Sequence, residues 1–206
     1  DHGFHLGDLG IWTKHTNYEQ ANRIPMLIAA PGVTQPNSRT GQLAESVDLF
    51  PTLAELAGLP APAGPQPIDG VSLVPVLKDP DARVRDHAFH VYPKGKMGRA
   101  IRTGRFRLVE WKQPEAPRKS AEIELYDYRE DPLETKNLAN ERPAEVKRLR
   151  TILDRYPEAV SGNGKPVKSA KSADGTQAGP APSEPMSPKI AKRNLRIITE
   201  SRPRKA

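Results

Sequence analysis

The sequence contains no cysteine and no long apolar run. Without cysteine, the chain can form no disulfide, no zinc–thiolate centre and no cysteine nucleophile. This absence does not indicate a compartment, because a chain without thiols is compatible with any redox state. No apolar stretch approaches the roughly 18 residues that a membrane-spanning helix needs, so the sequence predicts no membrane span.

The chain also lacks an even distribution of basic residues, although its formal net charge is +7. Residues 1–160 contain 22 basic and 22 acidic residues, whereas residues 161–206 contain 10 basic and 3 acidic residues. The whole excess therefore lies in the C-terminal stretch. The first 160 residues give no support for a nucleic-acid partner, and none is expected.

The first half of the chain predicts one strand and two helices after an irregular start. Residues 1–23 are rich in glycine, histidine and charge, which indicates a loop with at most one helical turn. The short apolar run at residues 24–32 ends in Pro-Gly and predicts a buried strand, central in its sheet. Residues 45–60 predict a helix, and residues 72–79 predict a second, shorter one.

The helix predicted at residues 45–60 has apolar residues at helical spacing and clear signals at both ends. Asp48 suits the N-cap, and Pro51 is tolerated in the first turn. Gly58 suits the C-terminal stop. The apolar positions are Val47, Phe50, Leu53, Leu56 and Ala57.

From residue 87 the pattern changes to alternating, β-branched and aromatic residues. Residues 87–92, 98–111 and 123–128 predict three or more strands of an antiparallel sheet, with a tight hairpin at Gly104. A following amphipathic helix is expected to cover that sheet. Its apolar face, within residues 144–156, consists of Val146, Leu149, Ile152 and Leu153.

Residues 158–206 form a basic tail of serine, glycine, proline, alanine and lysine with little to bury, which predicts disorder. The resulting domain prediction has three parts. Residues 1–86 form the first part, with helices and one predicted buried strand, residues 87–157 form an antiparallel sheet with its helix, and residues 158–206 are the tail.

The chain opens with its densest group of charged and metal-capable side chains. Asp1 offers the carboxylate oxygens that a hard divalent cation prefers, and His2 offers an imidazole, while Gly3 permits the backbone to turn. Lys14 follows at a fixed offset, and its ammonium suits an anionic substrate held near a metal. Taken alone, each of these residues is more often part of a solvated surface.

Three further residues of this segment are weaker candidates. His5 and His15 are candidates for contact with a substrate, although a single histidine is more often structural or solvated. Trp12 is expected in a core rather than as a platform for a substrate.

Several stretches in the same order resemble the sulfatase family. The first is "DHGFHLGDLGIWTKHTNYEQANRIPMLIAAPG" at residues 1–32, followed by "SVDLFPTLAELAGLP" at residues 46–60. "DGVSLVPVL" at residues 69–77 and "ELYDYREDPLETKNLA" at residues 124–139 are similar to later family markers. "MGRAIRTGRFRLVEW" at residues 97–111 is most similar to the iduronate-2-sulfatase-like branch.

The resemblance implies an alkaline-phosphatase-like α/β fold. Residues 1–86 would then be the C-terminal part of the catalytic α/β domain and supply the C-terminal portion of its large mixed sheet. Residues 87–157 would be a small antiparallel sheet with a covering helix. The resemblance also implies one divalent cation, calcium, with Asp1 and His2 at positions of family metal ligands. Lys14 matches the lysine that holds the sulfate group. Family members are commonly exported, so a periplasmic, extracellular or lysosome-like location is implied, and the oligomeric state is left open.

The family nucleophile has no counterpart in this chain. In sulfatases it is a formylglycine made from the first residue of a Cys/Ser-x-Pro-x-Arg motif. The closest match, "SRPRK" at residues 201–205, has Lys205 in place of arginine and lies in the predicted tail. We therefore expect the C-terminal part of a larger enzyme, with formylglycine in a preceding part. We also expect these 206 residues alone to turn over no aryl sulfate.

Two other functions compete with a sulfatase that acts on a sulfated glycan. A phosphoesterase or phosphonate hydrolase of the same superfamily would typically use two cations and more histidine ligands. A non-catalytic remnant would bind polyanions through the basic tail. Under the hypothesis of a sulfated glycan substrate, Lys94 is the candidate for contact with a second anionic group of the glycan, together with Lys96.

Overall fold

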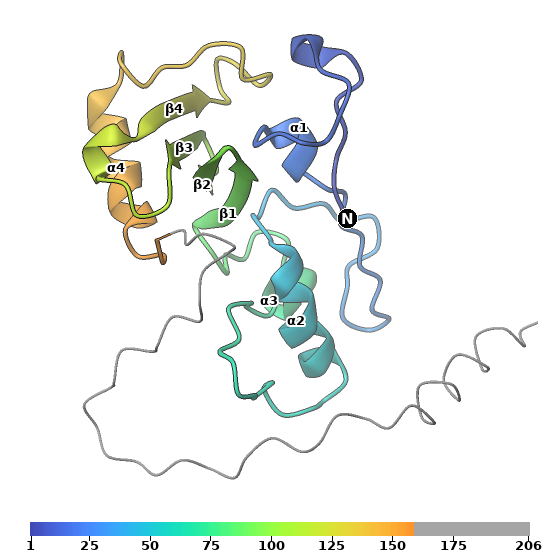
Figure 1. Ribbon diagram of the computed structural model, residues 1–206. Coiled ribbons are helices and arrows are strands. Elements are labelled where there is room, and N and C mark those ends of the chain that lie inside the picture. Colours follow the sequence, from blue (N-terminus) through green and yellow to red (C-terminus); the bar gives the residue numbers. More distant parts are fainter. Residues whose placement is uncertain (159–206) are drawn as a thin grey trace, which may run out of the picture. The chain divides into compact units, whose positions relative to one another are not determined.

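A four-stranded antiparallel sheet is the central element of residues 1–158, the part of the chain that this computed structural model describes (Figure 1). Its strands follow one another in sequence order: β1 (His87–Lys94), β2 (Lys96–Thr103), β3 (Phe106–Lys112) and β4 (Glu122–Asp127). Each strand pairs antiparallel with its neighbour. The antiparallel sheet predicted from residue 87 onward is confirmed.

Each of the two tight connections between the first three strands contains a glycine. Gly95 joins β1 to β2 in the left-handed region at φ +69°, and the flanking Lys94 and Lys96 pair across the turn. Gly104 and Arg105 form the two-residue connection between β2 and β3. The hairpin predicted at Gly104 is therefore present.

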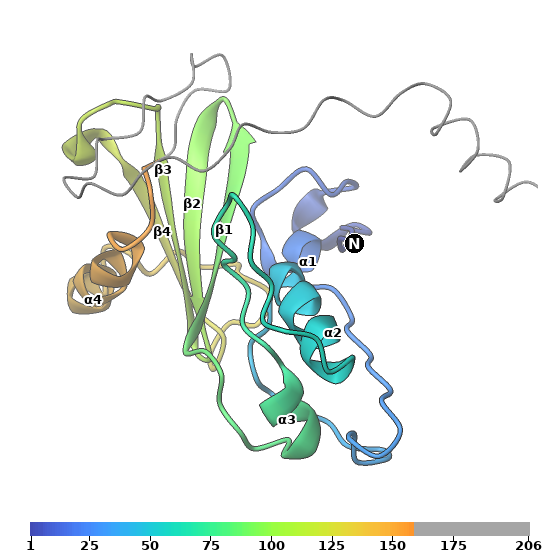
Figure 2. The ribbon, with the colours of Figure 1, turned by 90° about the horizontal axis from the view of Figure 1, so that it is seen from below.

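Helix α4 (Pro143–Leu153) packs on one face of the sheet, opposite the N-terminal segments (Figure 2). Leu149 and Leu153 of α4 are fully buried, and Val146 and Ile152 pack against the same core, as the apolar pattern predicted. The sheet contributes alternate residues to this face because side chains in a strand point to opposite sides in turn. The fully formed core consists of Ile101, Phe106, Leu108, Leu125, Leu138, Leu149 and Leu153.

A buried ion-pair network reinforces the contact between α4 and the sheet. The Glu110 carboxylate on β3 accepts a hydrogen bond from Arg99 of β2 at 2.7 Å and another from Arg150 of α4 at 2.6 Å. Glu110 is only 1% exposed, so its charge depends on these two partners.

The first half of the chain forms short helices joined by long irregular connections. The predicted helix at residues 45–60 and the shorter helix at residues 72–79 are both confirmed. They are α2 (Leu49–Leu56) and α3 (Val74–Lys78), and the other short helices of this half are η1 (Asp8–Gly10), α1 (Glu19–Asn22) and η2 (Ser46–Asp48). One further short helix, η3 (Arg118–Ser120), lies between β3 and β4. No helix of the described part is long and apolar enough to cross a membrane.

Helix α2 directs its large apolar residues outward. Phe50 is 59% and Leu53 is 61% exposed, while the buried residues of the helix are Thr52 and Ala54. Gly58 ends the helix at φ +66°, as predicted. Asp48 stands at the N-cap position, but its buried carboxylate accepts hydrogen bonds from the backbone N–H groups of Glu45 and Val71 instead of capping α2.

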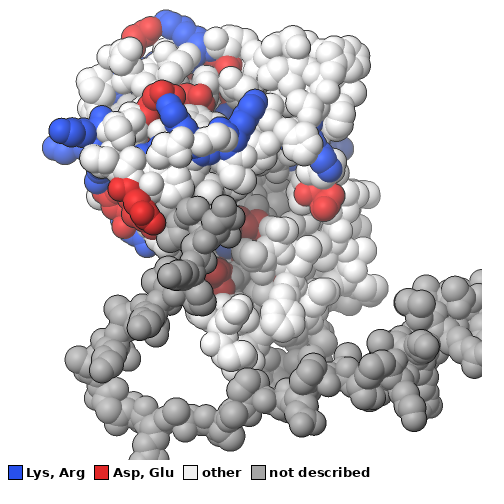
Figure 3. Space-filling model, in the orientation of Figure 1, with Lys and Arg blue, Asp and Glu red and all other residues white. Residues whose placement is uncertain are grey.

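The strand predicted at residues 24–32 is not formed within the described part. The segment pairs with no strand of the sheet, and Leu27 is 89% exposed. The segment was expected in the middle of a large mixed sheet, and no other strand of such a sheet lies within residues 1–158, where β1 to β4 form the only sheet. On the face in Figure 3, charged side chains gather over the sheet and α4, and few lie over α2.

The described residues lie within one compact unit. A boundary at residue 86 between two subdomains stays a prediction. The expectation of disorder for the tail concerns residues beyond the described part.

We expect Leu149→Ala to lower the free energy of unfolding by about 3 kcal/mol, because it leaves a cavity in the core between α4 and the sheet. Chemical denaturation followed by circular dichroism measures the loss. Leu133→Ala is the matched control, since Leu133 is 63% exposed, and should change stability by less than about 0.5 kcal/mol. Equal losses for the two variants would contradict the described packing.

Candidate functional site

The opening segment, residues 1–23, folds back on itself. The Gly3 N–H donates to the Ala21 carbonyl at 2.9 Å, and the His5 N–H donates to the Thr13 carbonyl at 2.9 Å. These bonds set the two ends of the segment side by side. As a result, the residues at its start lie next to Lys14.

Close approach, rather than a turn, accounts for the glycine at position 3. Gly3 does not adopt a left-handed backbone conformation, contrary to the turn suggested by the sequence. A Cβ atom at this position would instead overlap the carbonyl oxygen of Gln20. Only glycine lets the two chain segments approach this closely.

Asp1, His2 and Lys14 come together at the edge of this segment. The Lys14 ammonium donates to His2 Nε2 at 2.5 Å, and His2 Nε2 lies 3.8 Å from an Asp1 carboxylate oxygen. The other ring nitrogen, Nδ1, donates to the Gly3 carbonyl at 2.7 Å. This bond fixes the tautomer, so the lone pair of Nε2 points toward Asp1 and Lys14.

The two potential metal ligands fit one side of a cation site. Asp1 supplies a carboxylate and His2 an unprotonated nitrogen, and both are open to solvent, at 99% and 40% side-chain exposure. Within residues 1–158, no group of three or more histidine, aspartate or glutamate side chains could hold a metal ion. Calcium takes six to eight ligands, so this pair would need further ligands from elsewhere.

His5 lies inside the opening segment. Its Nδ1 bonds to the Asp8 carboxylate and its Nε2 bonds to the Thr16 hydroxyl at 2.7 Å, and the side chain is fully buried. The bonds from His5 and from the Leu6 N–H lower the pKa of Asp8, against the opposing effect of desolvation. With both ring nitrogens engaged, the geometry favours a structural role over the predicted contact with substrate.

The remaining candidates lie on the surface. Trp12 is 72% exposed and packs its ring against Gly7, so the expectation of a core tryptophan is wrong. His15 is also exposed. Lys94 is exposed at the hairpin between β1 and β2, and Lys96 forms an ion pair with Glu122.

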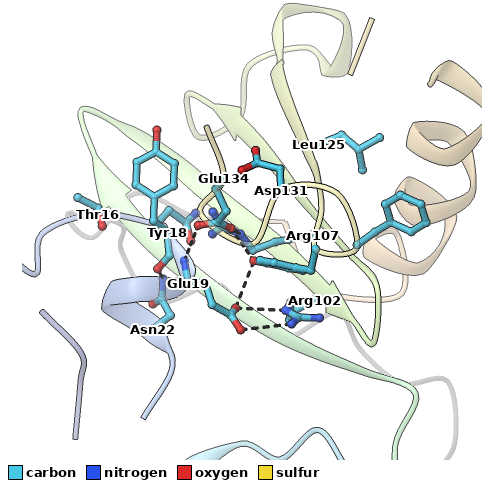
Figure 4. Close-up of polar contacts among 12 residues, drawn as sticks. Thr16, Tyr18, Glu19, Asn22, Arg102, Arg107, Leu125, Asp131 and Glu134 are labelled. Atoms are coloured by element: carbon cyan, nitrogen blue, oxygen red, sulfur yellow. Dashed lines mark hydrogen bonds and ion pairs between the residues drawn. The ribbon is translucent and has the colours of Figure 1, made fainter. Parts of the chain in front are cut away.

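A buried polar layer that the sequence reasoning missed lies between the opening segment and the sheet (Figure 4). Glu19 of α1 bonds to Arg102 of β2, and the Glu134 carboxylate accepts the backbone N–H of Glu19 at 2.8 Å. Glu134 belongs to the "DPLETKNLA" stretch, whose likeness to a family marker was the available signal. Residues 102 and 134 are distant from residue 19 in sequence, so spacing alone could not connect them.

Asn17 and His90 form a second contact of this layer. The buried Asn17 side chain accepts a hydrogen bond from Nε2 of His90 on β1. The Nδ2 atom of Asn17 lies 3.5 Å from the Gly98 carbonyl oxygen. Burial lowers the pKa of His90 to about 4, the Arg107 guanidinium adds to this effect, and the bond with Asn17 opposes it. His90 is therefore neutral at pH 7 and donates to Asn17.

Comparison with known proteins places this chain in a family. Residues 7–158 match the family described as "N-sulphoglucosamine sulphohydrolase, C-terminal". An N-acetylglucosamine-6-O-sulfatase from Bacteroides thetaiotaomicron is 29% identical over 174 residues, covering 79% of this chain. Iduronate 2-sulfatase from Mus musculus is 38% identical over 86 residues, covering 30% of this chain.

A solved structure shares the fold. It is a protein in complex with its substrate D-glucosamine-2-N,6-O-disulfate, 29% identical, with a TM-score of 0.64 over 75% of this chain and 32% of that one. The fold is thus that of the C-terminal region of alkaline-phosphatase-like sulfatases, a class of sulfuric ester hydrolases. This chain belongs to the N-sulphoglucosamine sulphohydrolase C-terminal family.

The chain spans less than a third of the length of these curated relatives. It covers 30% of the N-acetylglucosamine-6-O-sulfatase and 16% of the iduronate 2-sulfatase.

We expect His90 to make stability depend on pH. Its folded pKa of about 4 lies below the ordinary value of 6.5, so its contribution is complete above pH 6.5 and is lost as the pH falls toward 4. His90→Gln should remove this part of the dependence, as measured by Tm between pH 7 and pH 4.5. His15→Gln, at an exposed histidine, is the control and should keep the wild-type slope. Identical slopes for all three proteins would refute the expectation.

Proposed function

We propose that this chain is the C-terminal region of a sulfatase that hydrolyses sulfate esters of a sulfated glycan, of the iduronate-2-sulfatase-like type. The observation that carries the proposal is the convergence of Asp1, His2 and Lys14 at one edge of the opening segment. Membership of the sulfatase C-terminal family supports the reaction class. The named substrates of the relatives, including an iduronate and a glucosamine disulfate, support the glycan.

In this proposal, Lys14 is the catalytic residue that holds the sulfate group. Its ammonium is a compact positive charge, which favours the negatively charged sulfuryl oxygens in the ground state and in the transition state. The backbone bonds of the opening segment hold the backbone around Lys14 beside the residues at the start of the segment.

Asp1 and His2 would be ligands of one divalent cation, calcium. When bound, such a cation supplies Lewis-acid polarisation of the sulfuryl oxygens. His2 already has the tautomer that coordination of a cation through Nε2 requires, because its Nδ1 donates to the Gly3 carbonyl. Lys14 now donates to that same Nε2, so coordination at His2 would free the ammonium for the sulfate.

The nucleophile, a formylglycine, and the remaining metal ligands would come from polypeptide outside this chain. The two donors in the opening segment are too few for a calcium site, which supports the expectation that the 206 residues alone are inactive. A groove of about 1260 Å³ beside residues 24–29 and the exposed Phe50 and Leu53 also favour packing against further polypeptide. Lys94 is retained as a candidate contact with a second anionic group of the glycan.

In the full-length protein, we expect Lys14→Ala to lower kcat/KM for a sulfate ester by about a hundredfold or more, because a positive charge at the sulfate is lost. Lys14→Arg should retain part of the activity. Lys78→Ala, at an exposed lysine of α3, is the control and should leave kinetics unchanged. An unaltered kcat/KM in Lys14→Ala would remove Lys14 from the site.

We expect the full-length protein to bind one calcium ion per chain, and His2→Ala to weaken that binding by on the order of tenfold or more. Isothermal titration calorimetry gives both the stoichiometry and the affinity. His15→Ala is the matched control in the same segment. Two cations per chain would favour the phosphoesterase or phosphonate hydrolase alternative over a sulfatase.

A further inference from the structure

The four residues that follow the Lys14-His15 pair attach the opening segment to the rest of the described structure. Thr16 and Asn17 are buried, and Tyr18 packs edge-on between His5 and Tyr126 of β4. Glu19 completes the series through its backbone and its carboxylate. We call residues 16–19 the anchor. The position of Lys14 relative to the sheet depends on where the anchor is held.

Glu134 is the residue on which the anchor converges. One carboxylate oxygen accepts the Glu19 N–H at 2.8 Å, and the other accepts Arg107 Nε at 2.5 Å and the Tyr128 hydroxyl at 2.5 Å. The side chain is 3% exposed. Three donors, one of them charged, satisfy this buried carboxylate and fix its orientation (Figure 4).

The backbone at Glu134 is held in a conformation that glutamate rarely adopts. Its φ is +58°, in the left-handed region. Such a conformation persists only where the surroundings impose it, and it is concentrated at functional sites. Here it directs the carboxylate of the connection after β4 back to the anchor rather than toward solvent.

Arg107 and Glu19, which both bond to Glu134, make further contacts that hold the anchor. The Arg107 guanidinium lies 5.7 Å from the Tyr18 ring and 5.5 Å from the Tyr126 ring, so the arginine that bonds to Glu134 also supports Tyr18 of the anchor. The Glu19 carboxylate accepts hydrogen bonds from Arg102, and the Tyr128 hydroxyl, whose one proton is donated to Glu134, lies 3.3 Å from it. The anchor is thus held at its backbone, its ring and its carboxylate.

We propose that Glu134 is a positioning residue for the sulfate-binding lysine: it fixes the anchor on the antiparallel sheet and thereby sets the position of Lys14. The inference rests on the proposed function of Lys14. Glu134 would touch neither the sulfate nor the metal. It acts through the Glu19 N–H, Arg107 and Tyr128, and its effect is confined to the opening segment.

The test is Glu134→Gln in the full-length protein, with hydrogen exchange measured by mass spectrometry. Amides in the opening segment should exchange at least tenfold faster, while those of β2 and β3 keep their wild-type rates. Lys14 should also react faster with an amine-acylating reagent, because its surroundings are no longer fixed. Glu130→Gln is the matched control, since Glu130 lies in the same connection but is 59% exposed.

A second variant covers the case in which Glu134→Gln does not fold. Glu134→Asp keeps a carboxylate for Arg107 but shortens the side chain away from the Glu19 N–H, and it should show the same local acceleration. Unchanged exchange in the opening segment of a folded variant would overturn the proposal. Global unfolding of both variants would also overturn it, because Glu134 would then serve the whole sheet.

Kinetics separate this inference from the proposed function. If the full-length protein is a sulfatase, Glu134→Gln and Glu134→Asp should each lower kcat/KM about tenfold, and Glu130→Gln should leave it unchanged. If the protein has no sulfatase activity but exchange in the opening segment still accelerates, the proposed function fails and the positioning role stands. A large loss of activity with unchanged exchange would overturn the positioning role and leave the sulfatase proposal intact.

Discussion

The buried carboxylate of Glu134 joins the opening segment to the antiparallel sheet, and the geometry of the candidate site depends on that contact. A carboxylate inside a protein must find donors, because the cost of removing its charge from water is several kcal/mol. Glu134 finds them in the backbone of Glu19, in Arg107 of β3 and in Tyr128. Because the buried carboxylate must be met by donors, the ion pair is costly to form, and for the same reason its geometry is specific.

The two faces of the sheet have different chemistry, and the alternation along each strand is the cause. On β3, Phe106, Leu108 and Glu110 face α4, whereas Arg107 faces the anchor. The α4 face is mostly an apolar core. The other face consists largely of hydrogen-bonded polar and aromatic side chains. A rigid apolar layer on one side thus supports a polar layer that orients Lys14 on the other.

Periodicity and turn residues predicted the sheet, the hairpin at Gly104, α2, α3 and the apolar face of α4, because each of these depends on neighbours close in sequence. The strand at residues 24–32 and the buried Trp12 were wrong. Their burial depends on what other polypeptide packs against them, and hydrophobicity alone carries no information about that. Side-chain chemistry and the likeness to sulfatases identified Asp1, His2 and Lys14 as candidates, but their convergence could not be derived from spacing.

The amino-acid sequence by itself determined the order of the elements, the family and the absence of a cysteine nucleophile, since these follow from local pattern and composition. Only the tertiary structure decided that His2 presents Nε2 to Lys14, that His5 is enclosed, and that Glu134 holds residue 19 from 115 positions away. Such hydrogen bonds join atoms that are close in space, whatever the separation of their residues in the sequence. They become defined only when the sheet brings distant donors and acceptors within about 3 Å of one another.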